Sequence, residues 1–138
     1  MASAKLIPAR FLSLTAHFVL NVMLFWSRER NVYSCLDEVY SSSEYDTKDL
    51  QLLVGLITSL VFTIIELVGF LSGLSMFANL QALFSIAAHI TACITLAFFV
   101  TMEWSCDDYW YIFSFCSFLP LLTEVIVVTA TLRCRVFL

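Results

Sequence analysis

Residues 50–71 read LQLLVGLITSLVFTIIELVGFL, a long apolar run whose one charged side chain is Glu66. An α-helix rises about 1.5 Å per residue, so a run of this length spans about 33 Å, enough to cross a hydrocarbon core of about 30 Å. Three further apolar runs occupy residues 11–26, 80–102 and 109–132. The sequence therefore predicts four membrane-spanning helices.

The composition is also typical of a membrane protein. Hydrophobic residues make up 61% of the 138 residues and charged residues 13%, too little polar surface for a soluble protein of this size. Because lipid offers the backbone no hydrogen bonds, the runs are expected to be helical. Their short connections predict an all-α membrane fold in one domain, residues 1–138, with four antiparallel helices in a compact up-down bundle. The net charge of −4 argues against nucleic acid as a partner.

The basic residues that flank the runs are divided almost evenly between the two sides. Lys5, Arg10, Arg133 and Arg135 lie on the side of the termini, and Arg28, Arg30 and Lys48 on the other. The positive-inside rule predicts cytoplasmic termini, from a margin of four against three. Arg10 and Arg28 flank the short first run and are expected to extend to the two interfaces.

Two cysteines lie in the connections on the side opposite the termini. With cytoplasmic termini, loops 27–49 and 103–108 face an oxidising compartment, and each contains one cysteine. Cys35 and Cys106 are compatible with a disulfide or with two separate thiols, since sequence does not give the distance between them. Cys134, beside the membrane, is compatible with palmitoylation or with a free thiol.

Each predicted helix contains one ionisable side chain. These are His17, Glu66, His89 and Glu124. Counted from the side of the termini, they lie about 8–14 Å into the hydrocarbon core and therefore form one layer. Charge at this depth is costly, so the four side chains are expected to face the interior of the bundle.

Four interpretations of this layer remain open from sequence. It is compatible with a hydrogen-bonded structural network, a proton or ion pathway, a metal site, or contacts with separate partners. Four helices leave little room for a pore, and the residues lack the Glu-x-x-His spacing of di-metal bundles. The structural network is the preferred interpretation, and no metal is expected.

Small residues and a proline mark the packing faces of two helices. Ser59, Thr63, Glu66, Gly69 and Gly73 recur at intervals of three or four and so share one face of the second helix. Gly69 and Gly73 form a GxxxG motif, which permits close contact between helices. Pro120 is expected to kink the fourth helix. These faces predict packing within the bundle or against a helix of a partner.

Aromatic residues cluster at the span ends away from the termini. They are Trp26, Trp104, Tyr109, Trp110 and Tyr111. Amphipathic rings favour the membrane interface, so these five residues are expected to anchor the bundle there.

No catalytic motif is present in the spans or loops. The sequence lacks a GxSxG elbow, an HExxH pair, a glycine-rich phosphate loop and a cluster of cysteine and histidine ligands. An enzyme is therefore not expected, nor is a cofactor.

Several segments together resemble one known family. They are Ile7–Leu12 (IPARFL), Leu24–Arg28 (LFWSR), Glu44–Asp46 (EYD) with Asp49–Leu52 (DLQL), Glu66–Gly73 (ELVGFLSG), and Trp110–Phe113 (WYIF) continuing through Pro120 to Glu124. These segments are similar to the transmembrane protein 107 family, whose members belong to the ciliary transition zone. The similarity includes the loop lengths and the positions of Cys35 and Cys106, and is weaker before Leu6 and after Thr129.

This resemblance implies a location and a role. It implies four spans with cytoplasmic termini, at the transition zone at the base of the cilium. The implied partners are proteins of the Meckel syndrome module, namely tectonics, B9-domain proteins and other multi-pass members, together with membrane lipids. The implied role is to assemble this zone, supporting ciliogenesis, control of ciliary membrane composition and Hedgehog signalling. A small proton- or ion-conducting transporter subunit and a lipid-organising protein are the alternatives.

Overall fold

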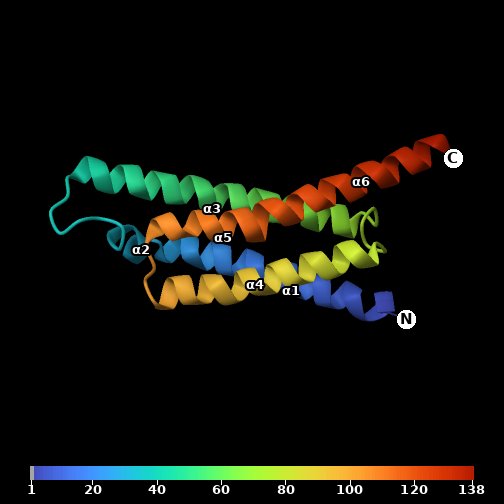
Figure 1. Ribbon diagram of the computed structural model, residues 1–138, viewed down its shortest axis with the longest axis horizontal. Helices are drawn as coiled ribbons and strands as arrows, with labels where there is room; N and C mark the ends of the chain where they lie inside the picture. Colours follow the sequence, from blue (N-terminus) through green and yellow to red (C-terminus); the bar gives the residue numbers. More distant parts are fainter. Residues whose placement is uncertain (1) are drawn as a thin grey trace.

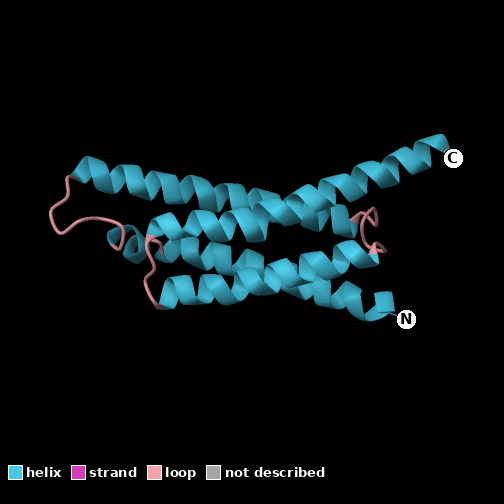
Figure 2. Cartoon of the chain, viewed as in Figure 1, coloured by secondary structure: helices cyan, strands magenta, loops and turns pink. Residues whose placement is uncertain are grey.

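The computed structural model describes residues 2–138, which form a bundle of four long helical segments (Figure 1). The elements are α1 (Ala2–Ser27), α2 (Glu29–Tyr33), α3 (Ser42–Leu71), α4 (Asn79–Thr101), η1 (Cys106–Asp108), α5 (Tyr109–Phe113), the π-helical turn η2 (Ser114–Phe118) and α6 (Leu119–Phe137). No strand occurs among the described residues (Figure 2). Four segments are long and apolar enough to cross a membrane. The predicted all-α membrane fold is confirmed.

Successive long helices run in opposite directions. The two termini and the turn after α3 lie at one end of the bundle, here called the terminus end (Figure 1). The connection through α2 and the connection after α4 lie at the opposite end, the loop end. α1 packs chiefly against α4 and α3, and the α5–α6 segment lies against α3 and α4.

The helices extend beyond the apolar runs, because a helix can continue into the polar interface where the free backbone N–H or C=O groups of its terminal turn find hydrogen-bond partners. α3 begins at Ser42, whose preceding residue Ser41 forms a capping box with Glu44. The Ser41 hydroxyl accepts the Glu44 N–H at 3.3 Å, and the Ser41 N–H is donated to the Glu44 carboxylate at 2.7 Å. Much of the predicted loop 27–49 is therefore helical.

The fourth segment accommodates Pro120 through a local change of helix type. The π-helical turn Ser114–Phe118 precedes α6, so Pro120 lies in the first turn of α6, where no helical N–H is required. The Thr123 hydroxyl donates to the Pro120 carbonyl at 2.8 Å.

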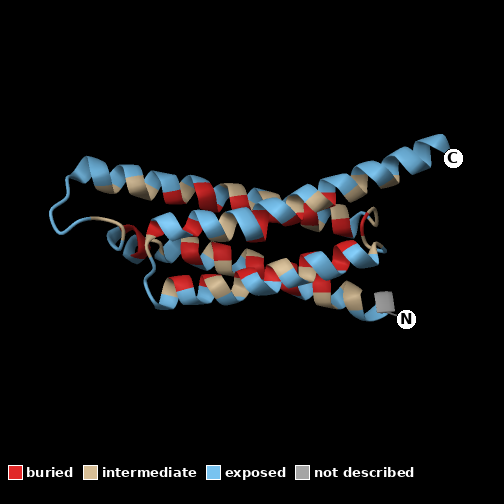
Figure 3. Cartoon of the chain, viewed as in Figure 1, coloured by how far each residue is buried: buried red, intermediate tan, exposed pale blue. Residues whose placement is uncertain are grey.

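The outer surface of the bundle is apolar, and many polar side chains are buried inside it, unlike in a soluble protein. Buried residues follow the inner faces of the helices, while the outer faces are exposed (Figure 3). Those outer faces are apolar, as at Val61, Ile64 and Val68 of α3. A hydrophobic cluster including Leu56 and Phe99 fills the loop end. Lipid therefore surrounds an apolar exterior, and most buried polar groups face one another inside.

Candidate functional site

A buried ion pair joins the first and last helices at the terminus end. Arg10 Nη2 lies 2.6 Å from Glu124 Oε2, and the two side chains are 0% and 2% exposed. The Ser75 hydroxyl donates to Glu124 Oε1 at 2.5 Å, and Gln81 Nε2 donates to Oε2 at 3.1 Å. Arg10 Nη1 donates to the Ser75 carbonyl at 3.1 Å. One carboxylate thus connects α1, the turn after α3, α4 and α6.

The expectation that Arg10 reaches the interface is wrong. Its guanidinium is buried because Glu124 balances its charge, and the group also lies 5.2 Å from the centre of the Phe70 ring. Without Arg10, the basic residues that support cytoplasmic termini are Lys5, Arg133 and Arg135. The positive-inside count is then three against three, and the orientation stays a prediction.

A second polar group links three helices through two histidines. His17 Nδ1 and His89 Nδ1 are 2.8 Å apart, and His89 Nε2 lies 2.9 Å from Glu66 Oε2. If Glu66 is ionised, it accepts from His89 Nε2–H, and His89 Nδ1 then accepts from His17. If Glu66 is protonated, both hydrogen bonds reverse. Both hydrogen bonds are therefore kept in either protonation state, whereas the buried Glu66 Oε1 has no hydrogen-bond partner among the residues that the structure describes.

The predicted layer of four ionisable side chains consequently divides into two groups. His17, His89 and Glu66 bind one another, whereas Glu124 binds Arg10 instead of a histidine. An arginine is always charged and forms strong charge-assisted bonds with a carboxylate, which favours this pairing over a histidine partner.

The two glycines of the GxxxG motif have different surroundings. A Cβ atom at Gly69 would lie 2.5 Å from Glu124 Oε1, so Gly69 provides the space that the carboxylate occupies. Gly73 lies beyond the end of α3 at φ +81°, a left-handed conformation that ends helices, and a Cβ there would meet nothing within 4 Å. Assigning Gly73 to a packing face is therefore wrong.

The other predicted packing residues lie inside the bundle. The Ser59 and Ser117 hydroxyls are 2.7 Å apart, and the Thr63 hydroxyl donates to the Ser59 carbonyl at 2.9 Å. Pro120 is also buried. This face of α3 packs against the fourth segment of the same chain and is not accessible to a partner helix.

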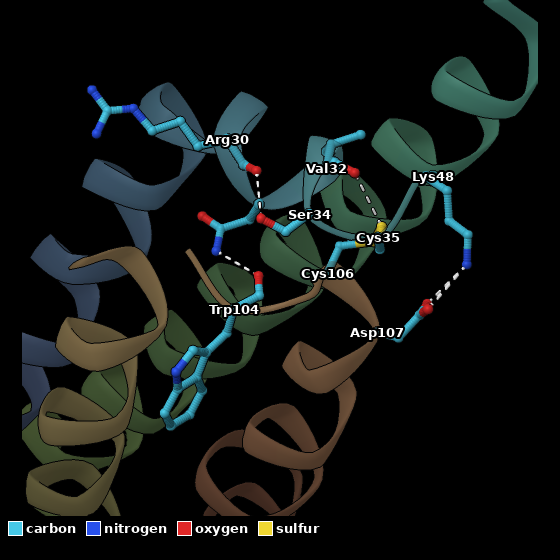
Figure 4. The surroundings of a disulfide bond; sticks show 9 residues. Arg30, Val32, Ser34, Cys35, Lys48, Trp104, Cys106 and Asp107 are labelled. Atoms are coloured by element: carbon cyan, nitrogen blue, oxygen red, sulfur yellow. Dashed lines mark hydrogen bonds and ion pairs between the residues drawn. A yellow bond between two sulfur atoms is a disulfide. The ribbon is translucent and has the colours of Figure 1, made fainter. Parts of the chain in front are cut away.

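At the loop end, a disulfide joins Cys35 to Cys106 with Cα atoms 5.7 Å apart (Figure 4). Asn31 strengthens the same connection, since its Nδ2 donates to the carbonyls of Phe99 at 2.8 Å and Trp104 at 2.9 Å. The segment after α1 is thereby attached to the segment after α4.

Two partly exposed ion pairs attach the first turns of α3 to the same end of the bundle. Arg28 Nε lies 2.7 Å from Asp49 Oδ1, and Lys48 Nζ lies 2.9 Å from Asp107 Oδ1 (Figure 4). Pairs this exposed contribute about 0–1 kcal/mol each. They orient the loop end more than they stabilise it.

Most of the predicted aromatic anchors lie at the surface of the loop end. Trp26 and Tyr111 are exposed, and Trp104 and Trp110 are just exposed.

Tyr109 is the exception, and its assignment as an anchor is wrong. It is 1% exposed, its ring packs against Gly55, and its hydroxyl donates to Asn21 Oδ1 at 3.3 Å. Gly55 has no side chain, and Asn21 offers an acceptor inside the bundle, so the inward position suits the phenol.

Comparison with known proteins gives the family. The family model TMEM107, described as a transmembrane protein, matches residues 6–128. The chain belongs to the transmembrane protein 107 family. The resemblance found in the sequence is thereby confirmed, and the chain is an integral multi-pass membrane protein.

Three relatives, each called transmembrane protein 107, are similar over most of their length. The Homo sapiens protein is 49% identical over 120 residues, covering 87% of this chain and 86% of the relative. The Danio rerio protein is 48% identical over 124 residues, covering 90% and 92%. The Xenopus laevis protein is 44% identical over 129 residues, covering 94% and 92%. No solved structure matches the chain.

Sequence reasoning missed three polar residues of this family member. Ser75 and Gln81 bind the buried carboxylate, and Asn31 joins the loop end. A signal for one of them was present, because Gln81, Ser85 and His89 recur every four residues and therefore share the inner face of α4. Asn31 lies in the five-residue helix α2 and Ser75 in the turn after α3, and both segments are too short for helical spacing to give such a signal.

Proposed function

We propose that this member of the transmembrane protein 107 family is a multi-pass scaffold of the ciliary transition zone. Its role is to help assemble that zone, supporting ciliogenesis, Hedgehog signalling and control of which membrane proteins enter the cilium. The observation that carries the proposal is the family match over residues 6–128. Both termini are assigned to the cytoplasm as part of this proposal.

The proposed mode of action is lateral association with tectonics, B9-domain proteins and other multi-pass members of the Meckel module. The arrangement of side chains supports a passive role of this kind. The ionisable groups of the spans bind one another, and continuous apolar surface such as Val61, Ile64 and Val68 faces outward. These outer faces are available to the spans of partners.

The loop end is the second proposed contact surface. Asp37 and Glu38 are exposed in the segment between α2 and α3, close to the disulfide that attaches this segment to the bundle. A fixed acidic surface suits partner domains outside the membrane that carry basic residues.

The test is rescue in ciliated cells that lack the endogenous protein. Tagged wild-type protein should concentrate at the base of the cilium and restore ciliation. Gly69→Leu should reduce both, because the leucine displaces Glu124 from its position beside α3. Val136→Leu is the control, since Val136 lies at the C-terminal end of α6, outside both proposed contact surfaces, and is 81% exposed. Wild-type protein spread over other membranes without rescue would refute the scaffold role.

A proton-conducting subunit is the second candidate, favoured by the hydrogen-bonded chain from His17 through His89 to Glu66. Reversal of these bonds would transfer a proton between Glu66 and His17. The purified protein in liposomes should then show a pH-driven flux that Glu66→Gln abolishes. Absence of flux above that of empty liposomes would eliminate this candidate.

A further inference from the structure

A groove of about 540 Å³ lies between α4 and α6 at the terminus end. Its lining includes Leu80, Phe84, Thr123, Ile126 and Val127. Figure 1 shows why it exists, because α6 diverges from the bundle as it runs toward the C-terminus. The groove opens sideways between side chains that face lipid, as the exposure of Leu80 and Ile126 indicates.

A basic side chain lies beside this groove, in a hollow that adjoins it. Ile126 also lines a neighbouring hollow of about 360 Å³, which includes Thr129, Ala130 and Arg133. Arg133 follows Ile126 by seven residues, close to two helical turns, so the two side chains share one face of α6. Arg133 is exposed and forms no ion pair with any residue that the structure describes.

The depths of these features in the membrane match those of the parts of an amphiphilic ligand. Gln81 binds Glu124, so the start of α4 lies level with residues close to Ile126 on α6. Arg133 lies about 10 Å further toward the terminus end, at the depth where headgroups begin. Apolar surface lies deeper and a guanidinium lies shallower, the sequence found along a phospholipid from acyl chain to phosphate.

We propose that the groove between α4 and α6 binds an anionic phospholipid from the leaflet at the terminus end. One acyl chain lies against Phe84, Ile126 and Val127, and the phosphate binds Arg133. A partner helix would need small residues for close approach and would have no use for the cation beside the groove. This assignment is independent of the scaffold role.

The chain offers a matched pair of arginines for the test. Arg135 follows Ile126 by nine residues, which places it on the opposite face of α6 but in the same leaflet. The protein is reconstituted in nanodiscs with equal amounts of phosphatidylcholine and phosphatidylserine, extracted in mild detergent, and weighed with its bound lipids by native mass spectrometry. Arg133→Gln should reduce retention of phosphatidylserine about fivefold relative to wild type. Arg135→Gln should leave it unchanged.

A second pair of variants tests the groove itself. Val127→Trp fills the groove and should abolish lipid retention, while Val61→Trp adds the same bulk to the outer face of α3 and should not. Equal effects of the two arginine variants would overturn the proposal by showing only general charge attraction. Loss of a dimer in Val127→Trp, with phosphatidylserine retained, would overturn it by assigning the groove to a second copy of the chain.

Discussion

Replacing Glu124 by leucine should destabilise the bundle far more than replacing an exposed acid. The substitution removes the acceptor of three side chains, Arg10, Ser75 and Gln81, and leaves the buried Arg10 guanidinium without its counter-ion. Breaking a buried pair in this way costs about 3–5 kcal/mol. Glu103→Gln should cost about 0–1 kcal/mol, because Glu103 is 53% exposed and lies 3.8 Å from Arg30.

The assay is a double-mutant cycle, with the free energy of unfolding measured in bicelles by steric trapping. Arg10→Met combined with Glu124→Leu removes both charges, so the double variant should be more stable than the sum of the single losses predicts. The expected coupling is about 3–5 kcal/mol, since a buried pair replaced by apolar residues often costs little. Additive losses, with coupling below about 0.5 kcal/mol, would refute the ion pair as an energetic connection between α1 and α6.

Three further results are expected. Cys35→Ser should lower the free energy of unfolding by about 4 kcal/mol, because the disulfide closes a long loop with a sequence separation of 71 residues. Cys93→Ser, at a free cysteine, should not lower it. Denaturation with and without reductant checks both expectations. Gly69→Ala should lower the free energy of unfolding by about 1–3 kcal/mol, because the added Cβ displaces Glu124. Val68→Ala should lower it by only about a few tenths of a kcal/mol in the same bicelle assay. Equal losses would argue against close packing at Gly69. Tyr109→Phe should lower the free energy of unfolding by about 1 kcal/mol or less, since the hydrogen bond from the Tyr109 hydroxyl to Asn21 is long at 3.3 Å. Trp26→Phe should leave the thermal midpoint unchanged. A loss well above about 1 kcal/mol for Tyr109→Phe would mean that the hydroxyl has further partners.

The fold was predictable because the decisive interactions are local. Each long run satisfies its own backbone hydrogen bonds, so length and hydropathy are enough to predict four helices. The buried positions of His17 and Glu66 were also predictable, because charge at membrane depth is stable only away from lipid.

Pairing and helix rotation were not predictable in the same way. Arg10 borders an apolar run and therefore resembles an interfacial residue, and its partner Glu124 lies 114 positions away in the chain. Tyr109, Trp110 and Tyr111 are adjacent in sequence, and only the rotation of the helix determines that the first is buried while the others face outward. Both outcomes depend on how whole helices align, which single-sequence spacing does not determine.

The disulfide also constrains how the chain is made. Two spans, α3 and α4, separate Cys35 from Cys106, so the two cysteines lie on the same face of the membrane when both spans have inserted. If only one of the two spans crosses, the thiols lie on opposite faces of the membrane and cannot be oxidised together. A disulfide between Cys35 and Cys106 therefore excludes chains in which only one of the two spans has inserted. If a protease cut the turn between α3 and α4, the disulfide would still join the two halves of the chain until a reductant broke it.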